Sequence, residues 1–191
     1  MSMNAQRLYP GMRDGNLEIF HIEEEDKLMA IKNGEIKDFE DLNSSETAFI
    51  TEIIDTEQKL KIVLENWWPG DKQAQIKQVA KCRFGGLNHI PDVSAFGSVA
   101  NHDHRDCSLR GNCIGENIVC KPLLFNGYEL SEKEIKAIRL MCTDMKNTVV
   151  CQELKMPEGS FQVFRTRLYE KLGNINCKQE LASIGVLLGI C

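Results

Sequence analysis

The distribution of cysteine is the feature that most constrains how this chain can fold. The 191 residues include eight cysteines, and none of them lies before Cys82. Four fall within residues 82–120, a stretch rich in Gly, Asn, Asp and His that shows neither helical nor strand periodicity. A loop of this length is uncommon in a compact chain unless it is functional or held in place. We therefore treat these four cysteines as candidate ligands.

The rest of the composition is that of an ordinary globular protein, with 42% hydrophobic and 27% charged residues. The N-terminus shows no signal-peptide pattern, and no stretch approaches the roughly 20 apolar residues of a membrane span. We expect a cytoplasmic protein that does not associate with membranes. In that compartment cysteines are more often metal ligands, catalytic groups or buried side chains than disulfides.

Charge and cysteine content divide the chain into three parts. Residues 1–80 hold 9 Lys/Arg against 16 Asp/Glu, residues 81–127 hold 5 against 4, and residues 128–191 hold 9 against 8. We expect an acidic helical region, then a Cys-rich loop module, then a helix-turn-helix domain over these ranges. The net charge of -5 argues against a broadly cationic surface for nucleic acid, but it allows a local basic face.

Helical periodicity predicts a mainly α fold. Helices are expected over residues 44–66 and 72–82, whereas residues 1–22 carry little pattern. Four further helices are expected over residues 130–190. The first of these four should begin at a capping box, in which Ser131 is the N-cap and Glu134 lies three residues further on.

Two of the C-terminal helices suit helix-turn-helix DNA binding, because both are short and a tight turn near Pro157 joins them. The second helix carries Arg165, Arg167 and Lys171, which can neutralise phosphates. From the residues alone, a helical bundle with a basic surface remains the alternative. Residues 130–173, LSEKEIKAIRLMCTDMKNTVVCQELKMPEGSFQVFRTRLYEKLG, resemble the LuxR-type four-helix DNA-binding domain. The opening LSEKE and the closing RTRLYEKLG carry much of this resemblance.

The resemblance implies that the recognition helix covers about residues 160–172 and contacts double-stranded DNA. The residues that would contact bases or backbone are Lys146, Asn147, Ser160, Gln162, Val163, Arg165, Thr166 and Lys171. The resemblance places Phe161, Leu168 and Leu172 in the core. One short recognition helix reads only a half-site, so we expect a homodimer. Related domains often dimerise through the last helix, here about residues 178–188.

The four loop cysteines suggest a metal centre. Cys82, Cys107, Cys113 and Cys120 have the spacing C-x24-C-x5-C-x6-C. Four thiolates can hold a tetrahedral zinc ion or anchor an iron–sulfur cluster. The gaps are longer than the usual C-x2–4-C spacing of structural zinc sites. Imidazole also binds zinc, so one of three nearby histidines could replace a cysteine; these are His89, His102 and His104. Free thiols without metal remain the plain alternative.

The sequence predicts a DNA-binding transcriptional regulator whose Cys-rich module binds a structural zinc. It contains no P-loop and none of the common hydrolase or dehydrogenase motifs, so we expect a protein that is not an enzyme. One alternative is a redox- or iron-responsive regulator with an iron–sulfur cluster. A second is a protein-interaction adaptor that does not bind DNA. Phe164 and the pair Trp67-Trp68 motivate the adaptor, since both could contact a partner.

Overall fold

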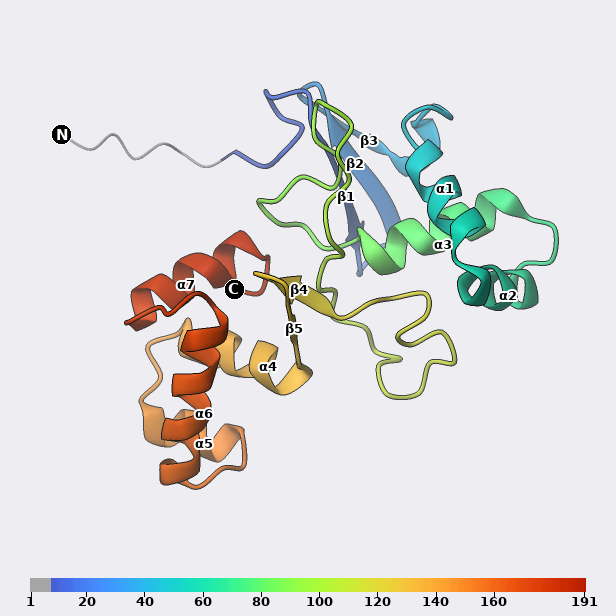
Figure 1. Ribbon diagram of the computed structural model, residues 1–191. Helices are drawn as coiled ribbons and strands as arrows, with labels where there is room; N and C mark the ends of the chain where they lie inside the picture. Colours follow the sequence, from blue (N-terminus) through green and yellow to red (C-terminus); the bar gives the residue numbers. More distant parts are fainter. Residues whose placement is uncertain (1–7) are drawn as a thin grey trace. The chain divides into compact units, whose positions relative to one another are not determined.

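A computed structural model describes residues 8–191 (Figure 1). The chain forms two compact units, of which the first ends at Lys121 and the second covers Pro122–Cys191. Residues 81–121 therefore belong to the same compact unit as the residues before them. The division expected from charge and cysteine content instead treats residues 81–127 as a separate module.

The first unit opens on a three-stranded antiparallel sheet that helical periodicity did not predict. Its strands are β1 (Leu17–Ile22), β2 (Lys27–Lys32) and β3 (Glu35–Asp38), paired in the order β1-β2-β3. Asn33 and Gly34 join β2 to β3 with positive φ angles of 54° and 82°. Asn-Gly between two strands is a strong signal for a type I′ hairpin.

Three helices follow the short 3-10 helix η1 (Phe39–Asp41). They are α1 (Ala48–Thr56), α2 (Gln58–Trp67) and α3 (Lys72–Arg83). The single helix expected over residues 44–66 is therefore two helices, and the chain breaks at Glu57. Helix α3 packs against β1 and α1, and the apolar faces of these elements form one core (Figure 1).

The second unit also opens on a β-hairpin. Strands β4 (Leu123–Phe125) and β5 (Tyr128–Leu130) pair across Asn126 and Gly127, whose φ angles of 49° and 79° match those of the first Asn-Gly turn. Four helices follow: α4 (Glu132–Met141), α5 (Asn147–Glu153), α6 (Glu158–Lys171) and α7 (Lys178–Leu187). The expected capping box at Ser131 is confirmed, because Ser131 and Glu134 bond to each other's backbone.

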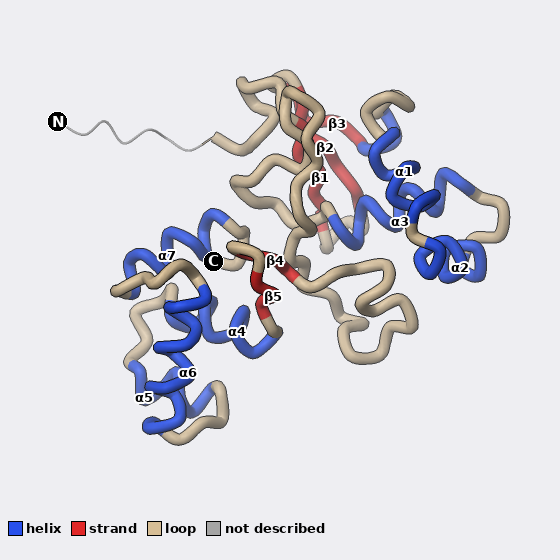
Figure 2. The backbone as a smooth tube through the Cα atoms, viewed as in Figure 1, coloured by secondary structure: helices blue, strands red, loops and turns tan. Residues whose placement is uncertain are grey.

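The expected fold class is wrong. Helices make up 41% and strands 13% of the structure, with two small sheets and seven helices among the described residues, so the chain is a mixed α/β protein. The C-terminal unit is likewise not a domain of four helices alone (Figure 2). The physical reason is that each Asn-Gly turn closes a local hairpin, and the strands of a hairpin have no helical periodicity. No helix within residues 8–191 is long and apolar enough to span a membrane.

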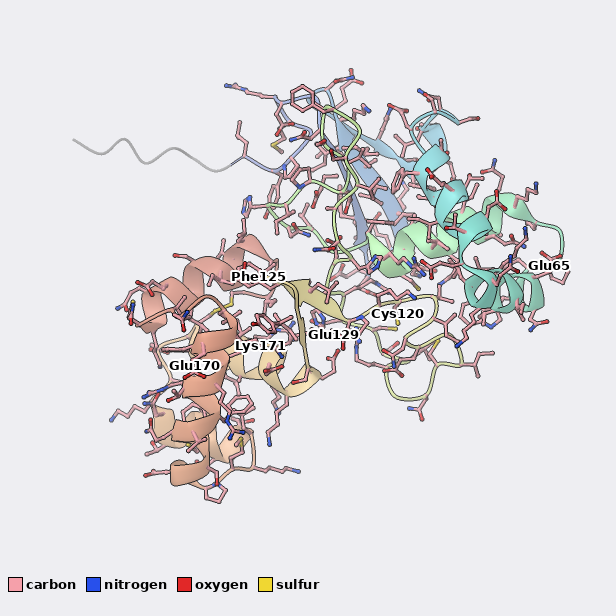
Figure 3. All side chains as sticks on the ribbon, in the orientation of Figure 1. Glu65, Cys120, Phe125, Glu129, Glu170 and Lys171 are labelled. Carbon is pink, nitrogen blue, oxygen red and sulfur yellow. A yellow bond between two sulfur atoms is a disulfide. The ribbon has the colours of Figure 1, made fainter. Side chains whose placement is uncertain are left out.

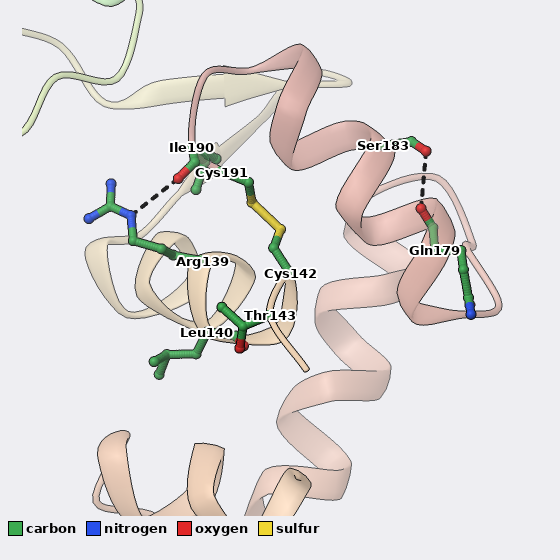
Figure 4. Close-up of a disulfide and its surroundings, with 8 residues drawn as sticks. All are labelled: Arg139, Leu140, Cys142, Thr143, Gln179, Ser183, Ile190 and Cys191. Atoms are coloured by element: carbon green, nitrogen blue, oxygen red, sulfur yellow. Dashed lines mark hydrogen bonds between the residues drawn. A yellow bond between two sulfur atoms is a disulfide. The ribbon is translucent and has the colours of Figure 1, made fainter. Parts of the chain in front are cut away.

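A disulfide joins two segments of the second unit. Cys142, the C-cap of α4, is bonded to Cys191 (Figure 4). The Nε of Arg139 donates to the carbonyl of Ile190 at 3.2 Å, which holds the same segment against α4. Cys151 of the same unit is buried and has a free thiol.

Candidate functional site

The four cysteines predicted as ligands line one pocket in the first unit. Cys82 lies on α3, and the other three follow on the long loop between α3 and β4, which Figure 2 draws without regular structure. The remaining lining residues are Trp67, Arg105, Arg110, Gly115, Glu116 and Val119. All four cysteines are half-buried and carry free thiols. The fold therefore brings together four cysteines of which the first and the last are 38 positions apart in sequence.

The thiols are close enough to interact electrostatically. Burial raises the pKa of the Cys82 thiol, and the neighbouring thiols of Cys120 and Cys107 raise it further. The side-chain amide of Gln78 lies 2.9 Å from the sulfur of Cys82 and opposes this effect, as does the charge of Arg105. A buried thiol of this kind stays protonated until a metal ion displaces its proton.

The donor set fits a thiophilic metal, but the ligand atoms do not surround one point. Within the part of the chain that the structure describes, no three His, Cys, Asp or Glu side chains are arranged to hold a metal ion. A single ion can be held here only if the thiols move closer together. Zinc in such a site is bound by thiolate sulfurs at about 2.3 Å.

None of the three histidines considered as substitute ligands lines this pocket. His89 stacks on Tyr9, with ring centroids 4.7 Å apart, and His102 contacts the Phe84 ring at 6.1 Å. Burial lowers the pKa of His102 to about 4. The Nε2 of His104 lies 3.4 Å from a carboxylate oxygen of Asp106. The candidate ligands are therefore the four cysteines.

Local turns shape the segment from Cys107 to Cys120, which we call the cysteine loop. The carbonyl of Cys107 accepts from the N–H of Arg110 at 3.1 Å, and the carbonyl of Cys113 accepts from the N–H of Glu116 at the same distance. Gly115 lies against the ring of Trp67, and a Cβ at this position would overlap that ring. The loop therefore approaches α2 closely at a position without a side chain.

Sequence reasoning missed the residue that anchors this loop. Arg83, at the end of α3, is fully buried, and its guanidinium donates to the carbonyls of Val119 at 2.8 Å and Ile118 at 2.9 Å. Its own carbonyl accepts from the N–H of Asp103 at 2.8 Å. Arg83 thus holds the chain on both sides of the cysteine loop. A lone arginine at a helix end carries no sequence signal for such a role.

The second unit contains the expected pair of helices joined by a tight turn. The turn between α5 and α6 includes Lys155, with a positive φ of 50°, and Pro157, the N-cap of α6. Phe161, Leu168 and Leu172 are buried, as expected for core positions. The opposite side of α6 is exposed and mostly polar.

The residues predicted to contact DNA fall into two groups. Five are exposed and accessible; these are Lys146, Ser160, Gln162, Val163 and Thr166. The other three are Asn147, Arg165 and Lys171, and each is half-buried. Lys171 is the last residue of α6 (Figure 3). Its ammonium binds both carboxylate oxygens of Glu134, at 3.0 and 2.9 Å. The guanidinium of Arg165 lies over the ring of Tyr169 at 5.9 Å.

Arg167 is an exposed cation on α6 that the predicted contact set did not include. It stands one residue after Thr166 and two after Arg165. Among the described residues it forms no ion pair. The composition of the helix had already marked it as able to neutralise phosphate, and it lies four residues after Val163, on the same side of the helix.

No protein-family model matches this chain, and comparison with curated proteins and with solved structures finds no match. The resemblance of residues 130–173 to the LuxR-type domain therefore stays a prediction from the sequence.

Proposed function

We propose that this chain is a cytoplasmic DNA-binding transcriptional regulator, not an enzyme, in which α6 reads the major groove as part of a homodimer. The exposed face of α6 carries this proposal. Gln162, Val163 and Thr166 lie on it near the helix start, where a recognition helix meets base edges. Arg167 supplies a free cation for phosphate. The sequence resemblance to LuxR-type domains supports the same assignment.

The pairing of Lys171 with Glu134 changes the expected role of Lys171. Both oxygens of Glu134 accept from its ammonium, and the pair joins α6 to the start of α4. A lysine held in this way keeps the recognition helix in position. We therefore assign phosphate contacts to Lys146 and Arg167, and a positioning role to Lys171.

We further propose that Cys82, Cys107, Cys113 and Cys120 bind one structural zinc ion. Their grouping around one pocket supports this, as does the lack of disulfides among them. The loop has little apolar content to bury, so metal binding would supply folding free energy that the residues lack. Zinc would draw the loop closer to Cys82 on α3. Arg105 and Arg110 would offset the negative charge of four thiolates.

Binding of the full chain to duplex DNA tests the first proposal. We expect affinity for mixed-sequence duplexes that falls steeply with salt. Arg167→Ala should weaken binding and reduce the slope of log affinity against log salt by about 1. Lys59→Ala is the matched control, because it removes an exposed cation from α2 in the other unit. Absence of any salt-dependent binding, together with a stable protein partner, would favour the adaptor alternative.

Elemental analysis of protein purified without air tests the metal proposal. We expect a colourless protein with about one zinc per chain. A brown protein with visible absorption and bound iron would instead establish the iron–sulfur alternative. Cys107→Ser should reduce the metal content, whereas Cys177→Ser should not, because Cys177 is a free thiol of the other unit.

A further inference from the structure

Three carboxyl groups lie buried together in the first unit. Glu18 is on β1, and Asp92 and Asp103 are on the loop that follows α3. Glu18 and Asp92 are fully buried, and only 9% of Asp103 is exposed. None of the three lines the cysteine pocket. Carboxyl side chains are almost never this deeply buried unless they are paired, so the cluster requires a physical explanation.

Two of these carboxyls tie the loop to β1. One oxygen of Glu18 accepts from the backbone N–H of Asn88 on the loop, at 2.9 Å. In the opposite direction, one oxygen of Asp92 accepts from the backbone N–H of Ile19 on β1, at 2.6 Å. The loop and the strand are therefore joined through side chains at both points.

The third carboxyl completes a connected network. Asp103 accepts from the side-chain amide of Asn88 at 2.6 Å and from the N–H of Gly86 at 3.2 Å. Asp103 also lies close enough to Asp92 and Glu18 for like-charge repulsion to disfavour ionisation of the cluster. Oε2 of Glu18 and Oδ1 of Asp92 are buried and have no hydrogen-bond partner among the described residues.

The described groups around the cluster supply no compensating positive charge. Asp14 adds a further negative charge near Glu18. The three histidines of the loop contact other side chains, since His89 stacks on Tyr9, His102 contacts Phe84, and Nε2 of His104 lies 3.4 Å from a carboxylate oxygen of Asp106. Within residues 8–191, no lysine or arginine side chain hydrogen-bonds to any of the three carboxyls.

We propose that Glu18, Asp92 and Asp103 form a proton-dependent latch. While the carboxyls hold protons, the cluster keeps the loop over residues 84–104 on β1. Once they lose these protons, buried negative charges repel one another and the loop separates from the strand. This latch is independent of DNA binding and of the metal centre.

The stability of the folded chain depends on pH because the pKa values of these carboxyls differ between the folded and the unfolded chain. Burial raises the pKa of Glu18 from 4.5 to about 9 and that of Asp103 from 3.8 to about 8, and it raises the pKa of Asp92 in the same direction. The unfolded chain therefore binds fewer protons than the folded chain between about pH 5 and pH 8. Stability is greatest at the acidic end of this window and falls as pH rises.

Urea unfolding of the full chain at several pH values tests the latch. Between the pKa of the unfolded chain and that of the folded chain, each such carboxyl is protonated only in the folded state. It then lowers the folding equilibrium constant about tenfold for each unit by which the pH rises. Glu18→Gln keeps the shape of a protonated Glu18 and removes its titration. We expect this variant to match the wild type near pH 5 and to exceed its urea midpoint near pH 8. Glu24→Gln, an exposed acid in the β1–β2 turn, is the control and should follow the wild type.

Amide hydrogen exchange provides a second measurement that reports on the loop itself. The N–H groups of Ile19 and Asn88 should lose protection as pH rises, beyond the intrinsic change in exchange rate, and Glu18→Gln should preserve it. Equal pH dependence in wild type and Glu18→Gln would overturn the latch. Mg²⁺ or Ca²⁺ could also stabilise the wild type strongly and leave Glu18→Gln unchanged. That result would overturn the latch too, because the cluster would then be a cation site.

Discussion

The guanidinium of Arg83 binds both carboxylate oxygens of Glu57, with nitrogen–oxygen distances of 2.6 and 2.9 Å. Glu57 stands at the break between α1 and α2, and Lys121 also binds it at 3.1 Å. The pair therefore joins the start of α2 to the end of α3. Arg83 also donates to the carbonyls of Val119 and Ile118. One buried side chain therefore contacts both the start of α2 and the end of the cysteine loop.

Replacing Arg83 by alanine should destabilise the first unit by about 3 kcal/mol. The change leaves the carbonyls of Val119 and Ile118 without their donor and Glu57 without its main counter-charge. Urea unfolding at neutral pH measures the loss, and metal content should fall with it because Cys120 adjoins the released segment. Arg165→Ala in the other unit is a control that removes the same side chain from a half-buried position. A stability within about 0.5 kcal/mol of wild type would contradict this account.

The Glu57 carboxylate should make the protein sensitive to acid. The side-chain hydrogen bond from Arg83 is the main reason that the pKa of Glu57 falls from 4.5 to about 2. Its contribution to stability is therefore complete above about pH 4.5 and is lost as pH falls towards 2. Glu57→Gln should flatten the unfolding free energy between about pH 5 and pH 3. An unchanged acid slope in this variant would show that other carboxyls cause the loss.

The disulfide between Cys142 and Cys191 should stabilise the second unit. It closes a loop over a sequence separation of 49 residues, for which the chain-entropy estimate is about 4 kcal/mol. Cys191→Ser should lower the unfolding free energy by about 2–4 kcal/mol without reductant and have little effect with reductant. Mass spectrometry of non-reduced peptides checks the pairing directly. Cys177→Ser should leave both measurements unchanged, because Cys177 is a free thiol.

Adding one methyl group beside Trp67 should disturb the cysteine loop. In Gly115→Ala the new Cβ overlaps the indole ring, so either the ring or the loop has to move. We expect a loss of about 1–3 kcal/mol and a change in tryptophan fluorescence. Gly159→Ala is the matched control, because nothing lies within 4 Å of a Cβ at that position on α6. Identical fluorescence and stability for both variants would refute the close contact.

Local sequence signals predicted most of the helices, but the expected helix over residues 44–66 breaks at Glu57, and the strands were missed. The capping box at Ser131 and the apolar spacing of α6 act within a few residues, so the sequence shows them directly. The hairpins were also marked locally, by Asn33-Gly34 and Asn126-Gly127, but helical periodicity does not detect them. The mainly α expectation failed for this reason.

The sequence by itself determined the start of α4 at its capping box, the two Asn-Gly turns and the set of thiols available to a metal ion, since each depends on neighbours along the chain. Only the tertiary structure brought Cys82 to the pocket of Cys107 and Cys120, paired Arg83 with Glu57, and buried Glu18 beside Asp92. These contacts join residues far apart in sequence. Whether a charged side chain finds a partner or loses its solvent depends on the packing of the whole core, which no local pattern encodes.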